Sequence, residues 1–342
     1  GYHANMWHIT GPVRTRDYHT AGEPFRIVTD GVPEVAGSTV AERRILAFES
    51  AELQAIRQFL CHEPRGHADM YGCFIVPPDD DGADLGVLFW HKDGYSTACG
   101  HGTIALGVWA VQSGLVTGNP DGVTPVTIDV PSGRVVARVH STAGSITHVV
   151  FENVESYVIE RGIRLDTSRG TVSVDLSYGG AIYASVSAAS VGLTVQPDDY
   201  GDLIAIGREI KWALNDSSLA KHATDDRLSG VYGTILFDDL GDTADGVHQR
   251  NVTVFADGEV DRSPCGSGTG ARLAILADEG RLREGQTLTH DSIVDTRFLG
   301  RFRPGTTPGT IIPEVEGMAY ATGDHTFTLD QTDPVGTGFV LR

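Results

Sequence analysis

Apolar residues recur at helical spacing in two segments of the chain and predict two amphipathic helices. The first covers residues 39–60, where Thr39 and Glu42 have the spacing of a capping box and Pro64 follows as a stop. The second covers residues 198–215, with Asp198 or Asp199 as its cap. The apolar positions are Ile45, Phe48, Leu53, Ile56 and Leu60 in the first segment, and Leu203, Ile206, Ile210 and Leu214 in the second.

Most of the remaining pattern is typical of short β-strands. Runs rich in β-branched residues are separated by turns containing Gly, Pro and Asp. We expect strands over residues 126–130, 135–139, 148–151, 172–176, 231–237 and 252–255. Strands therefore outnumber helices in each half of the chain, which favours an α+β fold.

Two further segments are apolar nearly all round, and a similar motif precedes each of them. A helix with this pattern is enclosed by other elements, so we expect two central helices. The repetition in the two halves predicts two pseudo-symmetric lobes, each a barrel-like sheet around its helix, with a site in the cleft where the helix N-termini meet. Tight packing of glycines is the alternative explanation. The motifs are Cys99-Gly100-His101-Gly102-Thr103 and Cys265-Gly266-Ser267-Gly268-Thr269.

A cysteine at a helix N-terminus is placed for acid/base chemistry. The helix dipole and free backbone N–H groups both favour the thiolate. Two such thiols on opposite sides of one carbon can remove a proton from one face and return one to the other, which inverts a stereocentre. The N–H groups of Gly100, His101, Gly266 and Ser267 would bind a substrate carboxylate and stabilise the charge that builds on it.

Charge and composition narrow the classes of partner. The 342 residues carry a formal net charge of −19, and Lys and Arg form no basic patch, so nucleic acid and anionic membranes are not expected partners. The chain has no apolar run of about 18 residues, and nothing before Arg14 resembles a leader peptide. We therefore expect a cytoplasmic protein.

The sequence predicts neither a metal nor an organic cofactor. It has no phosphate loop and no dinucleotide fingerprint. The segment from His62 to Tyr71 offers histidines and carboxylates, but lacks the spacing that puts two ligands on one helical face. Cys61 and Cys73 beside it form no CxxC pair, and we expect both to be buried.

Motifs along almost the whole chain resemble the proline racemase family, which includes hydroxyproline 2-epimerases and trans-3-hydroxy-L-proline dehydratases. The similarity is carried by residues 19–24, 63–72, 94–102 and 261–268. Residues 179–183 resemble the glycine pair that starts a strand in that family, and Asp333-Pro334 with Gly338-Phe339 resembles its C-terminal return.

The resemblance implies the fold of diaminopimelate epimerase, with the last strand returning to the first lobe. We expect an N-terminal lobe of residues 14–157 plus 330–342 and a C-terminal lobe of residues 158–329. Cys99 and Cys265 would be the acid/base pair. His101 and Asp261 would hold the ring nitrogen of the substrate, and Tyr71 and Phe255 would line the apolar side of its ring.

Different residues of the chain favour different reactions of the family, namely dehydration and epimerisation. Residues 94–97 and 64–71 look more like the dehydratase branch, but that branch typically has threonine where this chain has Cys265. Two thiols favour racemisation or epimerisation of proline or 4-hydroxyproline without a cofactor. Ala98 stands where related chains often have methionine, and its effect on the substrate is not predicted.

Three alternatives stay open at this stage. The first is a trans-3-hydroxy-L-proline dehydratase, and the second is a protein that binds proline derivatives without reacting. The third, a cysteine hydrolase, is disfavoured because no His and Asn or Asp stand in a recognisable nucleophile arrangement. The expected partner is a small-molecule substrate, and a homodimer is one assembly that the sequence leaves open.

Overall fold

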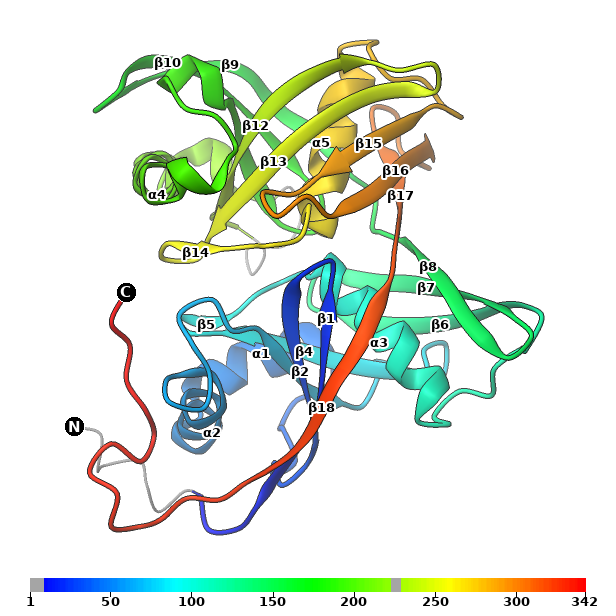
Figure 1. Ribbon diagram of the computed structural model, residues 1–342, viewed down its shortest axis with the longest axis vertical. Coiled ribbons are helices and arrows are strands. Elements are labelled where there is room, and N and C mark those ends of the chain that lie inside the picture. Colours follow the sequence, from blue (N-terminus) through cyan, green and yellow to red (C-terminus); the bar gives the residue numbers. More distant parts are fainter. Residues whose placement is uncertain (1–8, 223–228) are drawn as a thin grey trace.

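The computed structural model describes residues 9–222 and 229–342, and it has two lobes that each enclose one helix (Figure 1). The lower lobe in this view surrounds α3 (Gly100–Gln112) and the upper lobe surrounds α5 (Gly266–Asp278). Almost every residue of both helices is buried. The prediction of an α+β fold with two central helices is confirmed.

The N-terminal lobe is built from strands that flank three helices. Besides α3, it contains β1 (Val13–Thr20), β2 (Glu23–Asp30), α1 (Val40–Glu49), α2 (Ala51–Cys61), β3 (Gly72–Val76), β4 (Leu85–His91), β5 (Gly94–Tyr95), β6 (Gly122–Val130), β7 (Gly133–Thr142) and β8 (Ser145–Glu152).

The C-terminal lobe repeats this order of elements. Besides α5, it contains β9 (Tyr157–Thr167), β10 (Gly170–Tyr178), β11 (Ile182–Ser187), α4 (Tyr200–Asn215), β12 (Val231–Asp242), β13 (Gly246–Phe255), β14 (Glu259–Val260), β15 (Thr287–Asp291), β16 (Arg297–Pro304) and β17 (Ile311–Gly317). The chain then continues into β18 (Ala319–Phe327). All six predicted strands lie inside strands of the structure.

Strand pairing shows the pseudo-symmetry directly. In the first lobe the main run is β18-β1-β2-β3-β4-β6-β7-β8, with parallel pairing between β2 and β3 and between β4 and β6. In the second lobe it is β9-β10-β11-β12-β13-β15-β16-β17, with parallel pairs at the same two places. Antiparallel pairing of β8 with β17 joins the two runs into one sheet.

Strand β18 returns to the N-terminal lobe, and this corrects a predicted boundary. Strand β9 follows β8 but pairs with β10, while β18 follows β17 and pairs with β1 of the first lobe. The return to the N-terminal lobe therefore begins at Ala319 and not at residue 330. Most side chains of β18 are exposed, so its sequence lacks the alternating apolar pattern that would have marked the strand.

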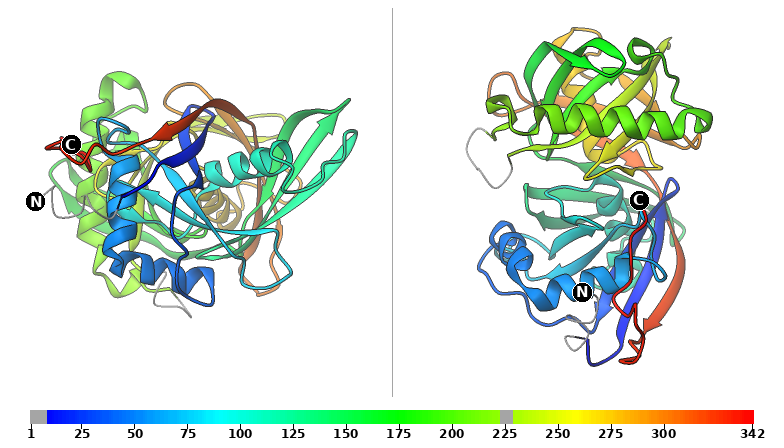
Figure 2. Two further views of the ribbon diagram at one scale, coloured as in Figure 1. Left: turned by 90° about the horizontal axis from the view of Figure 1, so that it is seen from below. Right: turned by 90° about the vertical axis from the view of Figure 1, so that its left-hand side faces the viewer.

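The two surface helices differ from prediction mainly at their ends. The expected helix 39–60 is two helices, because Ser50 ends α1 and its Oγ caps α2 by accepting from the Leu53 N–H. Thr39 caps α1 as predicted. Helix α4 buries the expected stripe and crosses the outer face of its lobe (Figure 2), but the Asp199 side chain accepts from the Thr194 N–H and does not cap it. No helix in the described part of the chain is long and apolar enough to cross a membrane.

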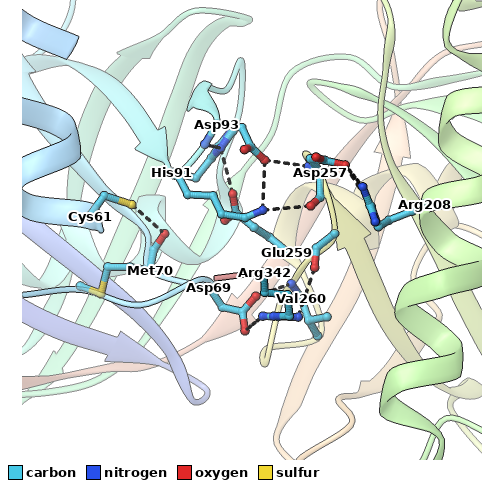
Figure 3. A network of polar contacts seen from close by, with 12 residues as sticks. Cys61, Asp69, Met70, His91, Asp93, Arg208, Asp257, Glu259, Val260 and Arg342 are labelled. Atoms are coloured by element: carbon cyan, nitrogen blue, oxygen red, sulfur yellow. Dashed lines mark hydrogen bonds and ion pairs between the residues drawn. The ribbon is translucent and has the colours of Figure 1, made fainter. Parts of the chain in front are cut away.

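Polar contacts tie the lobes together (Figure 3). Asp69 of the first lobe accepts from the Val260 N–H at 3.0 Å and pairs with Arg262 at 2.8 Å. It also binds the guanidinium of Arg342 near the C-terminus. Because the Asp69 carboxylate is buried and has several donors, these contacts hold the second lobe and the C-terminal segment in a fixed position.

A second contact between the lobes joins His91 to Glu259, and both side chains are buried. His91 Nδ1 lies 3.1 Å from Glu259 and also accepts from the Asp93 N–H at 3.2 Å. Burial raises the pKa of Glu259 and lowers the pKa of His91, each well away from its ordinary value. Burial therefore favours the neutral form of both groups at this contact.

The buried carboxyl predicts a pH-dependent stability. The pKa of Glu259 is raised on folding, so its neutral form persists in the native state above the unfolded pKa of about 4.3. Stability must then fall as pH rises from that value toward the folded pKa. Thermal unfolding midpoints should fall more for the wild type than for Glu259→Gln between about pH 5 and about pH 8. Substitution of the exposed Glu284 by Gln should leave the pH dependence of the unfolding midpoint as in the wild type. Equal falls of the midpoint in all three proteins would contradict a raised pKa of Glu259.

Candidate active site

Cys99 and Cys265 are the N-cap residues of α3 and α5. Each Sγ accepts a hydrogen bond of 3.2 Å from the N–H three residues later, at Gly102 and Gly268 respectively. The N–H groups of the two intervening residues have no acceptor within the first turn of the helix. Both motifs therefore offer a thiol together with two backbone donors for an anionic ligand.

Glycine allows the two helix N-termini to touch. A Cβ on Gly100 would lie 2.3 Å from the Gly266 Cα, and a Cβ on Gly266 would lie 2.5 Å from the Gly100 Cα. A Cβ on Gly102 or Gly268 would lie 2.9 Å from the neighbouring Sγ. No larger residue fits at these positions without moving a helix, so the glycines fix how closely the two thiol motifs approach.

The two caps differ in backbone conformation. Cys99 is extended, with φ −158°, whereas Cys265 has φ +64° and ψ 111°, a region that non-glycine residues rarely adopt. Such a residue is costly by about 1–3 kcal/mol and persists where the surrounding structure imposes it. Ser263 Oγ accepts from the Cys265 N–H at 3.0 Å and helps to hold this conformation.

One cavity receives side chains from both motifs. Of the predicted site residues, it is lined by Tyr71, Cys99, Gly100, His101, Phe255, Asp261, Cys265 and Ser267. Gly266 is not part of the lining but packs directly against Gly100. The structure therefore brings the whole predicted set together.

Three lining residues were not predicted, namely Tyr183, Tyr232 and Thr253. They lie on β11, β12 and β13. The alternation of a strand predicts which side chains point inward, but it does not predict which end of the strand reaches the cleft. Thr253 is two residues before Phe255 and so shares its face, which is the one sequence signal available. Ala98 also lines the cavity and packs against Gly180, where a Cβ would meet its own at 2.8 Å.

His101 is paired with the first thiol. Its Nε2 lies 3.3 Å from the Pro24 carbonyl oxygen and its Nδ1 lies 3.2 Å from Cys99 Sγ. A carbonyl only accepts, so Nε2 carries the proton and Nδ1 is left as an acceptor for the thiol. Burial lowers the pKa of His101, which is consistent with a neutral ring.

Burial dominates the ionisation of both cavity thiols. It raises the pKa of Cys99 and of Cys265 well above the ordinary value, and the nearby Asp261 carboxylate raises both further. The N–H groups of Gly102 and Gly268 act in the opposite direction, as expected for helix N-termini, but are outweighed. Burial and the Asp261 carboxylate therefore favour the protonated form of both thiols, and they outweigh the effect of the helix N-termini that the sequence predicts.

Asp261 is buried and held in place by its own turn. Its Oδ1 accepts from the Ser263 N–H at 2.8 Å and from the Ser263 hydroxyl at 2.7 Å, whereas Oδ2 has no donor among residues 9–222 and 229–342. A buried carboxylate beside two thiols favours a cationic group of a ligand.

The aromatic wall is polar at one edge. Tyr71 packs edge to face on Phe255 with ring centroids 5.8 Å apart, as expected for an apolar side. Its hydroxyl, however, is hydrogen-bonded to Ser96 and lies 3.3 Å from the Tyr232 hydroxyl. The cavity therefore presents hydroxyl groups as well as aromatic faces to a ring.

The cavity is small, with a volume of about 20 Å³. Such a volume is on the order of a single water molecule and cannot hold an amino acid. A substrate therefore requires movement of the lobes or of the lining side chains.

One group in the described chain has potential metal ligands close together. Atoms of His91, Asp93 and Glu259 lie within 4.8 Å of one another. The lone pair of His91 Nδ1 already accepts a hydrogen bond from the Asp93 N–H, and the ammonium of Lys92 lies 3.4 Å from Asp93. A nearby cation repels a metal ion, so the trio is explained by the contact between the lobes.

Comparison with known proteins gives concordant results. A family model described as proline racemase matches residues 16–340. A trans-3-hydroxy-L-proline dehydratase of Bacillus cereus is 42% identical over 335 residues, which are 96% of this chain and 97% of that protein. A 3-hydroxyproline 2-epimerase of Burkholderia multivorans is 43% identical over 339 residues, which are 98% and 99% of the two chains.

A solved structure supports the same assignment. The hydroxyproline epimerase of Agrobacterium vitis, with bound trans-4-hydroxy-L-proline, superimposes with a TM-score of 0.89 at 29% identity. The alignment covers 97% of this chain and 96% of the other, so the fold implied by the sequence resemblance is confirmed. The chain is therefore an enzyme that belongs to the proline racemase family.

Proposed function

We propose that this enzyme inverts the α-carbon of proline or a hydroxyproline, using Cys99 and Cys265 as its two acid/base groups and no cofactor. The thiolate of one cysteine takes the α-proton from one face. The thiol of the other then donates a proton to the opposite face, so one C–H bond breaks, another forms and the net charge of the enzyme is unchanged. The observation that carries this proposal is the pair of thiols on touching helix N-termini in one cavity.

Backbone donors would stabilise the intermediate. After deprotonation, negative charge spreads from the α-carbon into the substrate carboxylate. The N–H groups of Gly100, His101, Gly266 and Ser267 belong to the first turns of the two helices, where donors lack intrahelical acceptors. With the carboxylate held by fixed backbone groups, the α-carbon would lie between the two thiols.

The substrate also supplies the cation that the cavity lacks. A protonated ring nitrogen beside Asp261 would offset the charge that raises the pKa of both thiols. Nδ1 of His101 is placed to accept the Cys99 proton or a hydrogen bond from that nitrogen. The thiolate form would therefore be favoured only while the substrate is bound.

We propose that this reaction takes place in the cytoplasm.

Dehydration of trans-3-hydroxy-L-proline is the second candidate, because a relative 42% identical to this chain has that name. In this reaction a base removes the α-proton and the 3-hydroxyl leaves as water. One thiol at the α-carbon is sufficient, so the second could instead protonate the leaving hydroxyl. The hydroxyl groups of Tyr71 and Tyr232 would also suit a hydroxylated ring.

A substrate panel in deuterated water tests the proposal. The enzyme, dialysed against a chelator, should exchange the α-proton of its substrate for deuterium and produce the epimer. The panel contains L-proline, trans-4-hydroxy-L-proline and trans-3-hydroxy-L-proline. Formation of a cyclic imine without any epimer would favour the dehydratase instead. Absence of exchange with all three compounds, or activity restored by a metal, would refute the two-thiol proposal.

Substitutions of the thiols separate the two reactions. Cys99→Ser and Cys265→Ser should each lower epimerisation by about 10²–10⁴-fold, because a hydroxyl is much less acidic than a thiol. Cys73→Ala, a buried control outside the cavity, should retain turnover. Cys265→Thr should lose epimerisation but retain elimination if that reaction uses Cys99 alone. Near wild-type epimerisation by this variant would exclude Cys265 as an acid/base group.

Removal of the Asp261 charge should affect reactivity and turnover in opposite directions. The Asp261 carboxylate raises the pKa of both thiols, so Asp261→Asn lowers it and increases the thiolate fraction at a given pH. Alkylation of Cys99 and Cys265 by iodoacetamide should become several-fold faster, while turnover falls because the ring nitrogen loses its partner. Asn can still accept from Ser263, and Asp202→Asn on the protein surface is the matched control. Slower alkylation, measured by peptide mapping, would contradict this role.

A further inference from the structure

A second and much larger cavity lies between the lobes, with a volume of about 390 Å³. Its wall includes Tyr95 and Thr97 from the first lobe and Lys211, Trp212 and Tyr232 from the second. Tyr232 also lines the small cavity that contains Cys99 and Cys265, which we call the reaction cavity. Its ring stacks on Phe255 with centroids 5.6 Å apart. The two cavities are thus neighbours that share one aromatic side chain.

The side chain of Lys211 is an unusual part of this wall. The residue is only 7% exposed, and its ammonium lies 3.8 Å from the centre of the Trp212 ring. Among residues 9–222 and 229–342, no carboxylate or other acceptor lies within ion-pair or hydrogen-bond distance of that ammonium. Burying a charged group is unfavourable unless it is paired, and a ring face satisfies an ammonium only in part.

The acids nearest to Lys211 are occupied by other donors. Asp257 Oδ1 accepts from Arg208 at 2.6 Å and from the Trp212 indole at 3.4 Å. Asp93 Oδ2 accepts from the Asp257 N–H at 2.8 Å and from Lys92 at 3.4 Å. Figure 3 shows the side chains of Asp93, Asp257 and Arg208 in this network. These acids offset the charge of Lys211 at a distance but do not bind it.

Burial lowers the pKa of Lys211 to about 8, so the amine is mostly protonated at neutral pH. The cavity wall has charges of both signs, with Lys211 and Arg44 on one hand and Asp93 and Asp257 on the other. Ile182 and Val231 add apolar surface. A ligand with a carboxylate, a cationic nitrogen and a small apolar body matches this wall.

We propose that the second cavity is a binding site for a small zwitterionic amino acid, whose carboxylate is held by Lys211. The site is distinct from the reaction cavity and uses none of its acid/base groups. Two sources have this chemistry, namely the substrate on its way to the reaction cavity and a separate amino-acid effector. In either case the ligand would lie against Tyr232, which gives it direct contact with a wall of the reaction cavity.

Binding is tested with the reaction cavity blocked. Cys99 and Cys265 are alkylated with iodoacetamide, the modification is verified by mass spectrometry, and L-proline is titrated to about 10 mM by calorimetry. The modified wild type should bind one equivalent. Lys211→Met, which keeps the length of the side chain, should weaken binding at least about tenfold. Lys221→Met removes an exposed lysine and should bind as the wild type does.

Absence of binding by the modified wild type, or equal affinity of Lys211→Met and Lys221→Met, would overturn the proposal. This readout needs no turnover, so it stands apart from the proposed reaction, whose failure would appear as activity that survives alkylation. Kinetics of the unmodified enzyme then identify the source. A higher KM with unchanged kcat in Lys211→Met indicates substrate in transit, whereas unchanged KM with loss of the response to a second amino acid indicates an effector.

Discussion

The contact between two helix N-termini is the constraint on which the rest of this structure depends. Gly100 and Gly266 approach so closely that a Cβ on either would lie within 2.5 Å of the other helix. This approach brings two thiols and two sets of backbone donors to one small cavity. Each helix must also be enclosed by its own sheet, because it is apolar nearly all round. Two similar lobes around one contact satisfy both requirements.

Electrostatics explains why the cavity needs its ligand in order to react. Burial and Asp261 keep both thiols protonated, and the helix N-termini alone do not overcome this. In the proposed reaction, a cationic ring nitrogen of the substrate would offset the Asp261 charge, and the substrate carboxylate would bind the free N–H groups. The cavity would therefore acquire a base only when the correct zwitterion is bound, which limits side reactions of a reactive thiolate.

The return of strand β18 to β1 links the second lobe to the first while leaving a junction between them. Pairing of β8 with β17 makes the sheet continuous, and buried groups such as Asp69, His91 and Glu259 close the interface. The reaction cavity is too small for an amino acid, so this junction must loosen to admit one. The second cavity lies at the same junction, where a ligand would influence how the lobes close.

The amino-acid sequence by itself determined the two central helices, the strand-rich lobes and the two thiol motifs, because each is encoded in local motifs and periodicity. The places of Tyr71, Phe255 and Asp261 in the site were implied only by the resemblance to the family. Only the tertiary structure decided the features that depend on distant segments. The break at Ser50, the place of β18, the hydroxyl-bearing wall of Tyr183, Tyr232 and Thr253 and the protonated thiols fall in this class. The apolar pattern of a strand predicts which side chains point inward, but it does not predict which strand lies beside it. The ionisation of a thiol depends on how completely the fold removes it from water.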